Sequence, residues 1–94
     1  MPKDKVLLIG RNPDLLVEVQ SILSAEGYDL GVALRDDDAI ALLEEERFDA
    51  VVIGDAVGAD SRERLRAIAN RRSPSVRIIE QLSFVDDLLR KLAA

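Results

Sequence analysis

Cysteine, histidine and tryptophan are absent from this chain of 94 residues, and its aromatic residues are two phenylalanines and one tyrosine. These absences exclude disulfides, thiolate nucleophiles, imidazole bases and the ligand sets of the common structural zinc sites. The core must be built from aliphatic side chains, and any metal site would have to use oxygen ligands.

The N-terminal apolar residues 6–9 are too few for a signal-peptide core or a membrane span. We therefore expect a cytoplasmic protein that does not bind membranes. A formal net charge of −5 disfavours binding to nucleic acid, because that binding depends on clustered Lys and Arg. The length allows one domain, residues 1–94, and a content of 48% apolar and 33% charged residues is typical of globular chains.

The apolar run at 50–53, followed by Gly54 and Asp55, is the stretch around which the chain is organised. Four consecutive apolar residues cannot alternate between core and water, so they predict a strand of a parallel sheet buried on both faces. Residues 6–9, followed by Gly10, predict a second such strand beside it. Ligands of these sheets bind beyond the carboxyl ends of the strands, so Gly54 and Asp55 should border any functional site.

The first helix has clear signals at both of its ends. Asn12 is a capping residue, Pro13 suits the first helical position, and Gly27 is a typical stop. Residues 28–34 then predict an edge strand that is less buried than its neighbours.

Two further helices carry most of the charge. Residues 36–38 are three aspartates before the apolar residues 39–43, and they indicate either a metal site or, more simply, acids that stabilise a helix N-terminus. Residues 61–72 form the only basic stretch, which is either a solvated face or a docking surface for an acidic partner. Residues 76–79 predict a fourth strand, and Ser83 caps a last helix.

Strand and helix thus alternate four times, which predicts an α/β fold. We expect a flavodoxin-like, doubly wound parallel sheet with four strands in the order 2-1-3-4 and about four helices.

The order and spacing of these segments resemble a response-regulator receiver domain of the CheY type, the phosphorylatable module of two-component signalling. The similarity spans nearly the whole chain and is closest over residues 5–54. The segments that carry it are KVLLI at 5–9, NPDLL at 12–16, ILSAEGY at 22–28 and DAVVI at 49–53.

The resemblance also implies that the family's chemical positions are altered. Two magnesium-binding acids follow the first strand in the family, and Gly10 and Arg11 stand there in this chain. The position of the phosphate-accepting aspartate is Gly54, with Asp55 one residue later, and Glu80 aligns with the family's hydroxyl residue. The family's fifth strand and its lysine have no counterpart, so the resemblance is to a degenerate, shortened receiver.

Phosphoryl transfer to a carboxylate needs a divalent cation and a lysine to hold the charge of the phosphoryl oxygens. Arg11 cannot chelate magnesium, and we expect it to pair with Asp55 and hold one conformation. The chain is therefore expected to have no catalytic residues, no metal and no cofactor.

Three functions remain open on these residues. The leading hypothesis is a non-phosphorylatable, receiver-like module that is not an enzyme and binds signalling proteins or itself. In the second, Asp55 accepts phosphate with Arg11 as its counter-charge. In the third, the turn at residues 10–12, beside Gly54, binds a small anion or nucleotide at a helix N-terminus.

The missing fifth strand predicts a homodimer. The strand at 76–79 would otherwise present unpaired N–H and C=O groups beside apolar side chains, which invites strand addition. A small domain also gains stability from an interface. The expected interface joins the fourth strand and the last helix and consists of Val76, Arg77, Ile78, Ile79, Phe84 and Leu88.

Overall fold

The computed structural model describes residues 4–80 and 85–93 of the chain. Within them strand and helix alternate from end to end. The elements are β1 (Lys5–Ile9), α1 (Pro13–Ala25), β2 (Asp29–Ala33), α2 (Asp36–Glu45), β3 (Ala50–Ile53), α3 (Ala59–Arg72), β4 (Arg77–Ile79) and α4 (Val85–Ala93). None of the described helices is long and apolar enough to cross a membrane.

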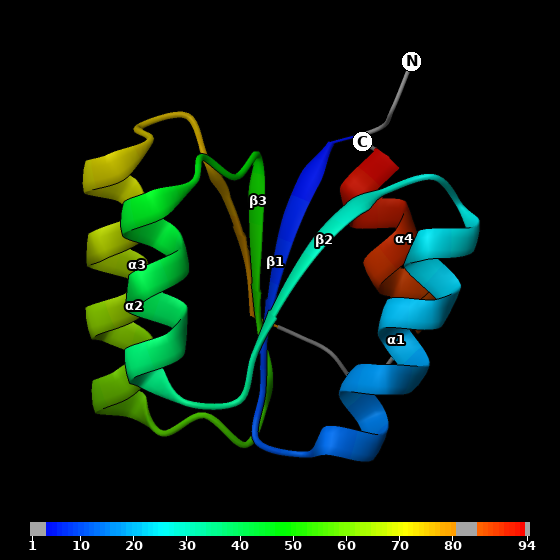
Figure 1. Ribbon diagram of the computed structural model, residues 1–94, viewed down its shortest axis with the longest axis horizontal. Helices are drawn as coiled ribbons and strands as arrows, with labels where there is room; N and C mark the ends of the chain where they lie inside the picture. The colour runs from blue at the N-terminus through cyan, green and yellow to red at the C-terminus, as the bar shows by residue number, and fades with distance from the viewer. Residues whose placement is uncertain (1–3, 81–84, 94) are drawn as a thin grey trace.

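The strands form one parallel sheet in the order β2-β1-β3-β4. Helices α1 and α4 cover one face of this sheet, and α2 and α3 cover the other (Figure 1). The crossovers from β1 to β2 and from β2 to β3 therefore pass over opposite faces, as in doubly wound α/β proteins. The predicted fold class, strand number and strand order are confirmed.

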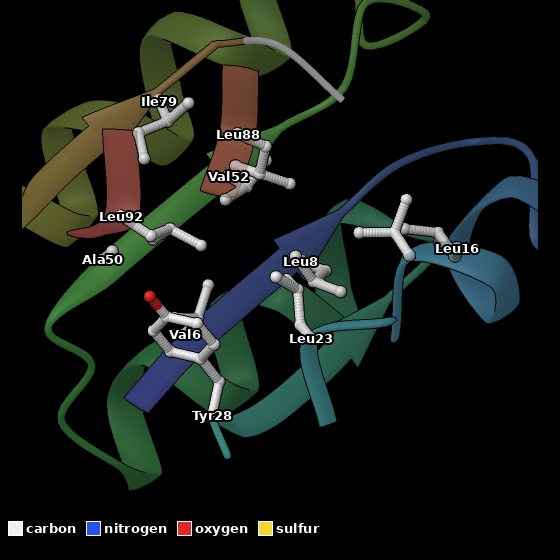
Figure 2. Packing of buried hydrophobic residues seen from close by; sticks show 11 residues of the cluster. Val6, Leu8, Leu16, Leu23, Tyr28, Ala50, Val52, Ile79, Leu88 and Leu92 are labelled. Atoms are coloured by element: carbon white, nitrogen blue, oxygen red, sulfur yellow. The ribbon is translucent and has the colours of Figure 1, made fainter. Parts of the chain in front are cut away.

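The two central strands are buried on both faces, as their unbroken apolar runs predict. Residues 6–9 and 50–53 all have 0% exposed surface. Alternate side chains belong to different cores: Leu8 and Val52 pack with α1 and α4, whereas Ile9 and Ile53 pack with α2 and α3. Figure 2 shows Val52 beside Leu88 of α4 in the first of these cores.

The first helix begins and ends where its signals predict. The Oδ1 atom of Asn12 accepts hydrogen bonds from the backbone N–H groups of Asp14 at 3.1 Å and Leu15 at 3.3 Å. Pro13 occupies the first helical position. Gly27 has a φ of 94°, a left-handed conformation that a residue with a Cβ atom adopts at a cost.

Some predicted boundaries move by one or two residues. Helix α3 begins at Ala59 rather than at Ser61, because Gly58 is the N-cap residue and Asp60 suits the first turn. Strand β4 begins at Arg77, since the N–H of Val76 donates to the carbonyl of Ser73 in the preceding turn at 3.0 Å. The predicted cap Ser83 lies outside the described residues.

Truncating the central strand should be costly. Ile53→Ala leaves a cavity in a fully buried site, so we expect the free energy of unfolding to fall by ~2–5 kcal/mol. Val17→Ala is the control, because this side chain on α1 is 61% exposed and its loss should change stability by less than about 0.5 kcal/mol. Urea denaturation measures both, and equal losses would show that β3 is not the strand on which the core depends.

Candidate functional site at the carboxyl edge of the sheet

Gly10 and Gly54 extend the two central strands by one residue each. The N–H of Gly10 donates to Ala33 O at 3.1 Å, and the N–H of Gly54 donates to Ile9 O at 2.8 Å. Both glycines are buried. The residues that follow them, Arg11 and Asp55, therefore leave the sheet side by side at its carboxyl edge, where ligands of parallel sheets bind.

A pocket of about 150 Å³ opens at this point. Its described lining consists of residues 10–12, Leu15 and residues 54–56, so it gathers four predicted site positions: Gly10, Arg11, Gly54 and Asp55. Among these lining residues Asp55 supplies the single carboxylate. Over the described residues there is no group of three or more acids that would hold a metal ion.

Arg11 does not turn towards Asp55, so the expected pairing of these two residues is wrong. Its Nη1 donates to Leu34 O at 2.8 Å, and its Nη2 lies 2.5 Å from Asp36 Oδ1. The physical reason is the sheet order: β2 pairs with β1, so the start of α2 lies directly beside the end of β1. Arg11 thus joins the loop after β1 to the loop after β2.

Asp36 is bound from two sides. Ser61 Oγ, in the first turn of α3, donates to Asp36 Oδ2 at 2.5 Å, while Arg11 holds the other carboxylate oxygen. The hydrogen bond from Ser61, followed by that from Arg11, lowers the pKa of Asp36 below its ordinary value. The Asp36 carboxylate therefore links the three loops that follow β1, β2 and β3 at the carboxyl edge of the sheet.

Glu80, the fifth predicted site position, belongs to a separate cluster with α3. Its carboxylate oxygens lie 3.5 Å from Arg62 Nε and 3.6 Å from Arg66 Nη1. Arg62 Nη2 also donates to Val57 O at 3.0 Å, so the same arginine holds the loop after β3. Its Nε is buried and makes no hydrogen bond, because the geometry towards Glu80 permits an ion pair only.

The sequence did not single out Asp36, Ser61, Arg62 or Arg66 as site residues. The pattern of Asp36 and its two neighbours predicts acids at a helix N-terminus. This interpretation is correct for its position in the first turn but omits its partners. The sequence does contain one signal for them. The loops after the first three strands all leave a parallel sheet at the same edge, so residues near 11, 36 and 61 should lie close together.

The predicted dimer interface is partly used by the chain itself. Leu88 has 0% and Ile79 6% exposed surface, and both lie in the core between the sheet, α1 and α4 (Figure 2). As core residues they cannot supply side chains to a partner, which corrects that part of the prediction. Val76 and Ile78 are half-buried against the other core, and Phe84 lies outside the described residues.

Arg77 fastens the last helix to the fourth strand. Its guanidinium donates to the carbonyls of Lys91 at 3.0 Å and Leu92 at 2.9 Å, in the last turn of α4. It also lies 2.7 Å from a carboxylate oxygen of Asp4. A positive group at a helix C-terminus satisfies carbonyls that have no partner within the helix. Among the described strands β4 pairs with β3 alone.

Several of the solved structures that this fold matches are receiver domains. The chemotaxis protein CheY4 of Vibrio cholerae superposes with a TM-score of 0.73 at 16% identity, covering 97% of each chain. A CheY-like receiver domain from Methanospirillum hungatei gives 0.72 at 18% identity, covering 99% of this chain and 92% of that one. TrrA of Thermotoga maritima, solved in complex with Mg²⁺ and BeF, gives 0.62 at 15% identity, covering 98% and 99%.

No protein-family model and no curated protein matches the chain. The resemblance drawn from the sequence is confirmed at the level of the fold: the chain has the fold of receiver domains.

Replacing Asp36 tests the link between the three loops. Asp36→Asn removes the charge held by Arg11 and Ser61, so we expect a loss of about 1 kcal/mol in the free energy of unfolding at pH 7. The pKa of Asp36 is lowered in the folded protein, so this stabilisation is complete above the ordinary value of 3.8 and is lost as the pH falls through the folded-state value.

Urea denaturation of wild type and variant between pH 7 and pH values below 3.8 should therefore give curves that converge at low pH. Asp38→Asn is the matched control, because it removes a neighbouring acid that binds neither Arg11 nor Ser61. A loss for Asp38→Asn as large as that for Asp36→Asn would contradict the assignment.

Proposed function

We propose that this domain works in signalling by binding proteins, and that it neither accepts phosphate nor catalyses a reaction. The observation that carries the proposal is the position of the Arg11 guanidinium, which is fixed to Leu34 O and Asp36 at the edge of the pocket. This is the place where the receiver resemblance expects acids that bind a metal ion. The receiver fold of the neighbours supports a signalling role. The cytoplasm is the compartment expected from the sequence.

The chemistry of phosphoryl transfer supports this proposal. Charge on the transferred phosphoryl group has to be held by a divalent cation and by positioned donors. The pocket offers Asp55 as its one carboxylate among the described lining residues, and Gly54 has no side chain to accept phosphate. TrrA, by contrast, was solved in complex with Mg²⁺ and BeF.

The contacts of Arg11 and of Arg62 favour one fixed arrangement of the loops at the carboxyl edge of the sheet over loops that change conformation. Arg11, Asp36 and Ser61 join the loops after β1 and β2 to the start of α3. Arg62 joins the loop after β3 to Glu80 beyond β4. A loop that is tied to its neighbours by charged groups loses the freedom to rearrange when a ligand arrives, which suits a permanent binding surface.

We further propose that the domain binds a second copy of itself. The edge strand β4 has only three described residues, and the domain has a small core. Association would stabilise the strand and the core. The backbone edge of β4 is the surface predicted from the sequence, although Leu88, Ile79 and Arg77 are used within the chain.

The absence of phosphorylation is tested with acetyl phosphate and magnesium. Intact-mass spectrometry should show an unmodified chain, because the groups that would hold a metal ion and a phosphoryl group are replaced. Asp55→Asn is the control for the remaining acid. An adduct of about 80 Da that appears on the wild type and is missing from the variant would overturn the proposal and make Asp55 an unusual phosphate acceptor.

Self-association is tested by sedimentation equilibrium over micromolar concentrations. The proposal expects a mass that rises with concentration towards twice the 10.4 kDa of the chain. The proposal of a homodimer fails if the protein stays at the monomer mass over the whole range at low salt, where attraction between charged groups is strongest.

A further inference from the structure

Two exposed rows of opposite charge lie side by side on the face formed by α2 and α3. The acids belong to α2 and the bases to α3, and the exposed members are Asp37, Asp38, Glu44, Glu45, Arg64 and Arg71. In the described part of the chain none of the six forms an ion pair. An exposed alanine lies midway along each row, Ala41 on α2 and Ala67 on α3.

The rows run at matching heights. Helices α2 and α3 point in the same direction on one face of the sheet (Figure 1). Their first turns are joined by the hydrogen bond from Ser61 to Asp36, and their last turns by Arg72, which donates to Leu43 O at 3.2 Å and Glu44 O at 2.7 Å. The acids and bases at the two ends of the helices are therefore level to within about one turn.

We infer that this face binds a second copy of the chain, an inference that rests on the proposed self-association and names its surface. The two-fold axis runs parallel to the helices and lies between the two copies, in front of the boundary between α2 and α3. It places α2 of each copy on α3 of the other. Asp37 then faces the partner's Arg64, Glu45 faces the partner's Arg71, and each contact occurs twice, as in an isologous interface. The alanines permit a close approach of the helices.

A second copy fits this face better than another protein of one dominant charge. An acidic partner would bind Arg64 and Arg71 and repel the acids of α2, and a basic partner would do the reverse. A second copy related by the two-fold rotation places bases opposite the acids of α2 and acids opposite the bases of α3. It also brings an arginine to Glu44 and Glu45, which lie at the end of α2 where the helix dipole disfavours acids.

Two other exposed acids on α3 do not interrupt the basic row. Asp60 lies in the first turn, where the positive end of the helix dipole stabilises it. Glu63 lies one turn before Arg66, on the flank that faces Glu80 and away from α2. The association depends on exposed charges, so it should be weak and should weaken further as salt screens them.

Reciprocal charge reversal tests the surface. One variant carries Arg64→Glu and Arg71→Glu, and the other carries Asp37→Lys and Glu45→Lys. Each alone should raise the dissociation constant of the homodimer on the order of tenfold or more in sedimentation equilibrium at low salt, because like charges then face each other. An equimolar mixture of the two should associate again, and so should one chain that carries all four changes.

A variant with Asp14→Lys and Glu18→Lys is the matched control for the Asp37→Lys and Glu45→Lys variant, since it makes the same change of charge at exposed positions on α1 and should associate like the wild type. Urea denaturation verifies that each variant is folded. If the arginine variant does not fold, the acid variant, compared with the α1 control, still tests the surface. If the acid variant does not fold, the arginine variant is compared with the chain that carries all four changes, whose net charge equals that of the wild type.

The outcomes separate this inference from the proposed function. A wild type that associates while both reversal variants associate equally well overturns the α2–α3 surface and leaves the homodimer to the edge of β4. Two monomeric variants that stay monomeric when mixed also overturn it, because general repulsion would then explain both losses. A wild type that is monomeric at low salt overturns the surface and the proposed self-association together.

Discussion

The burial of β1 and β3 on both faces is the constraint on which the rest of the structure depends. No residue of either run can face water, so helices must cover both sides of the sheet. The chain meets this requirement by crossing over one face to reach β2 and over the other to reach β3. That reversal separates the loops after β1 and β3, and the pocket at residues 10–12 and 54–56 opens between them.

The fold therefore provides a site, and a few side chains decide its chemistry. Arg11 supplies a positive charge that cannot dissociate as a bound metal ion can. Its planar guanidinium donates hydrogen bonds to Leu34 O and Asp36. Ser61 then completes the carboxylate's hydrogen bonds from the next helix. The chain's own side chains thus link three loops at this edge of the sheet.

The sequence predicted the fold well because its signals are local and repeated. Unbroken apolar runs, the cap at Asn12 and the stop at Gly27 each depend on a few neighbouring residues. The partner of Arg11 was predicted wrongly because it depends on which strand lies beside β1 and on where α2 begins. Three adjacent aspartates look equivalent in the sequence, and tertiary structure alone singles out Asp36.

The contacts of Arg77 also depend on tertiary structure and could not be predicted from the sequence. In the sequence Arg77 is the one charge of a short apolar strand, and the sequence places it in the expected dimer interface. In the structure its guanidinium reaches the last turn of α4 and Asp4, so it stabilises the chain that it belongs to. With Ile79 and Leu88 in the core, β4 offers a partner mainly its backbone. The face of α2 and α3 instead carries charged side chains that form no ion pair with any other described residue, and on our proposal these charges give the domain its specificity.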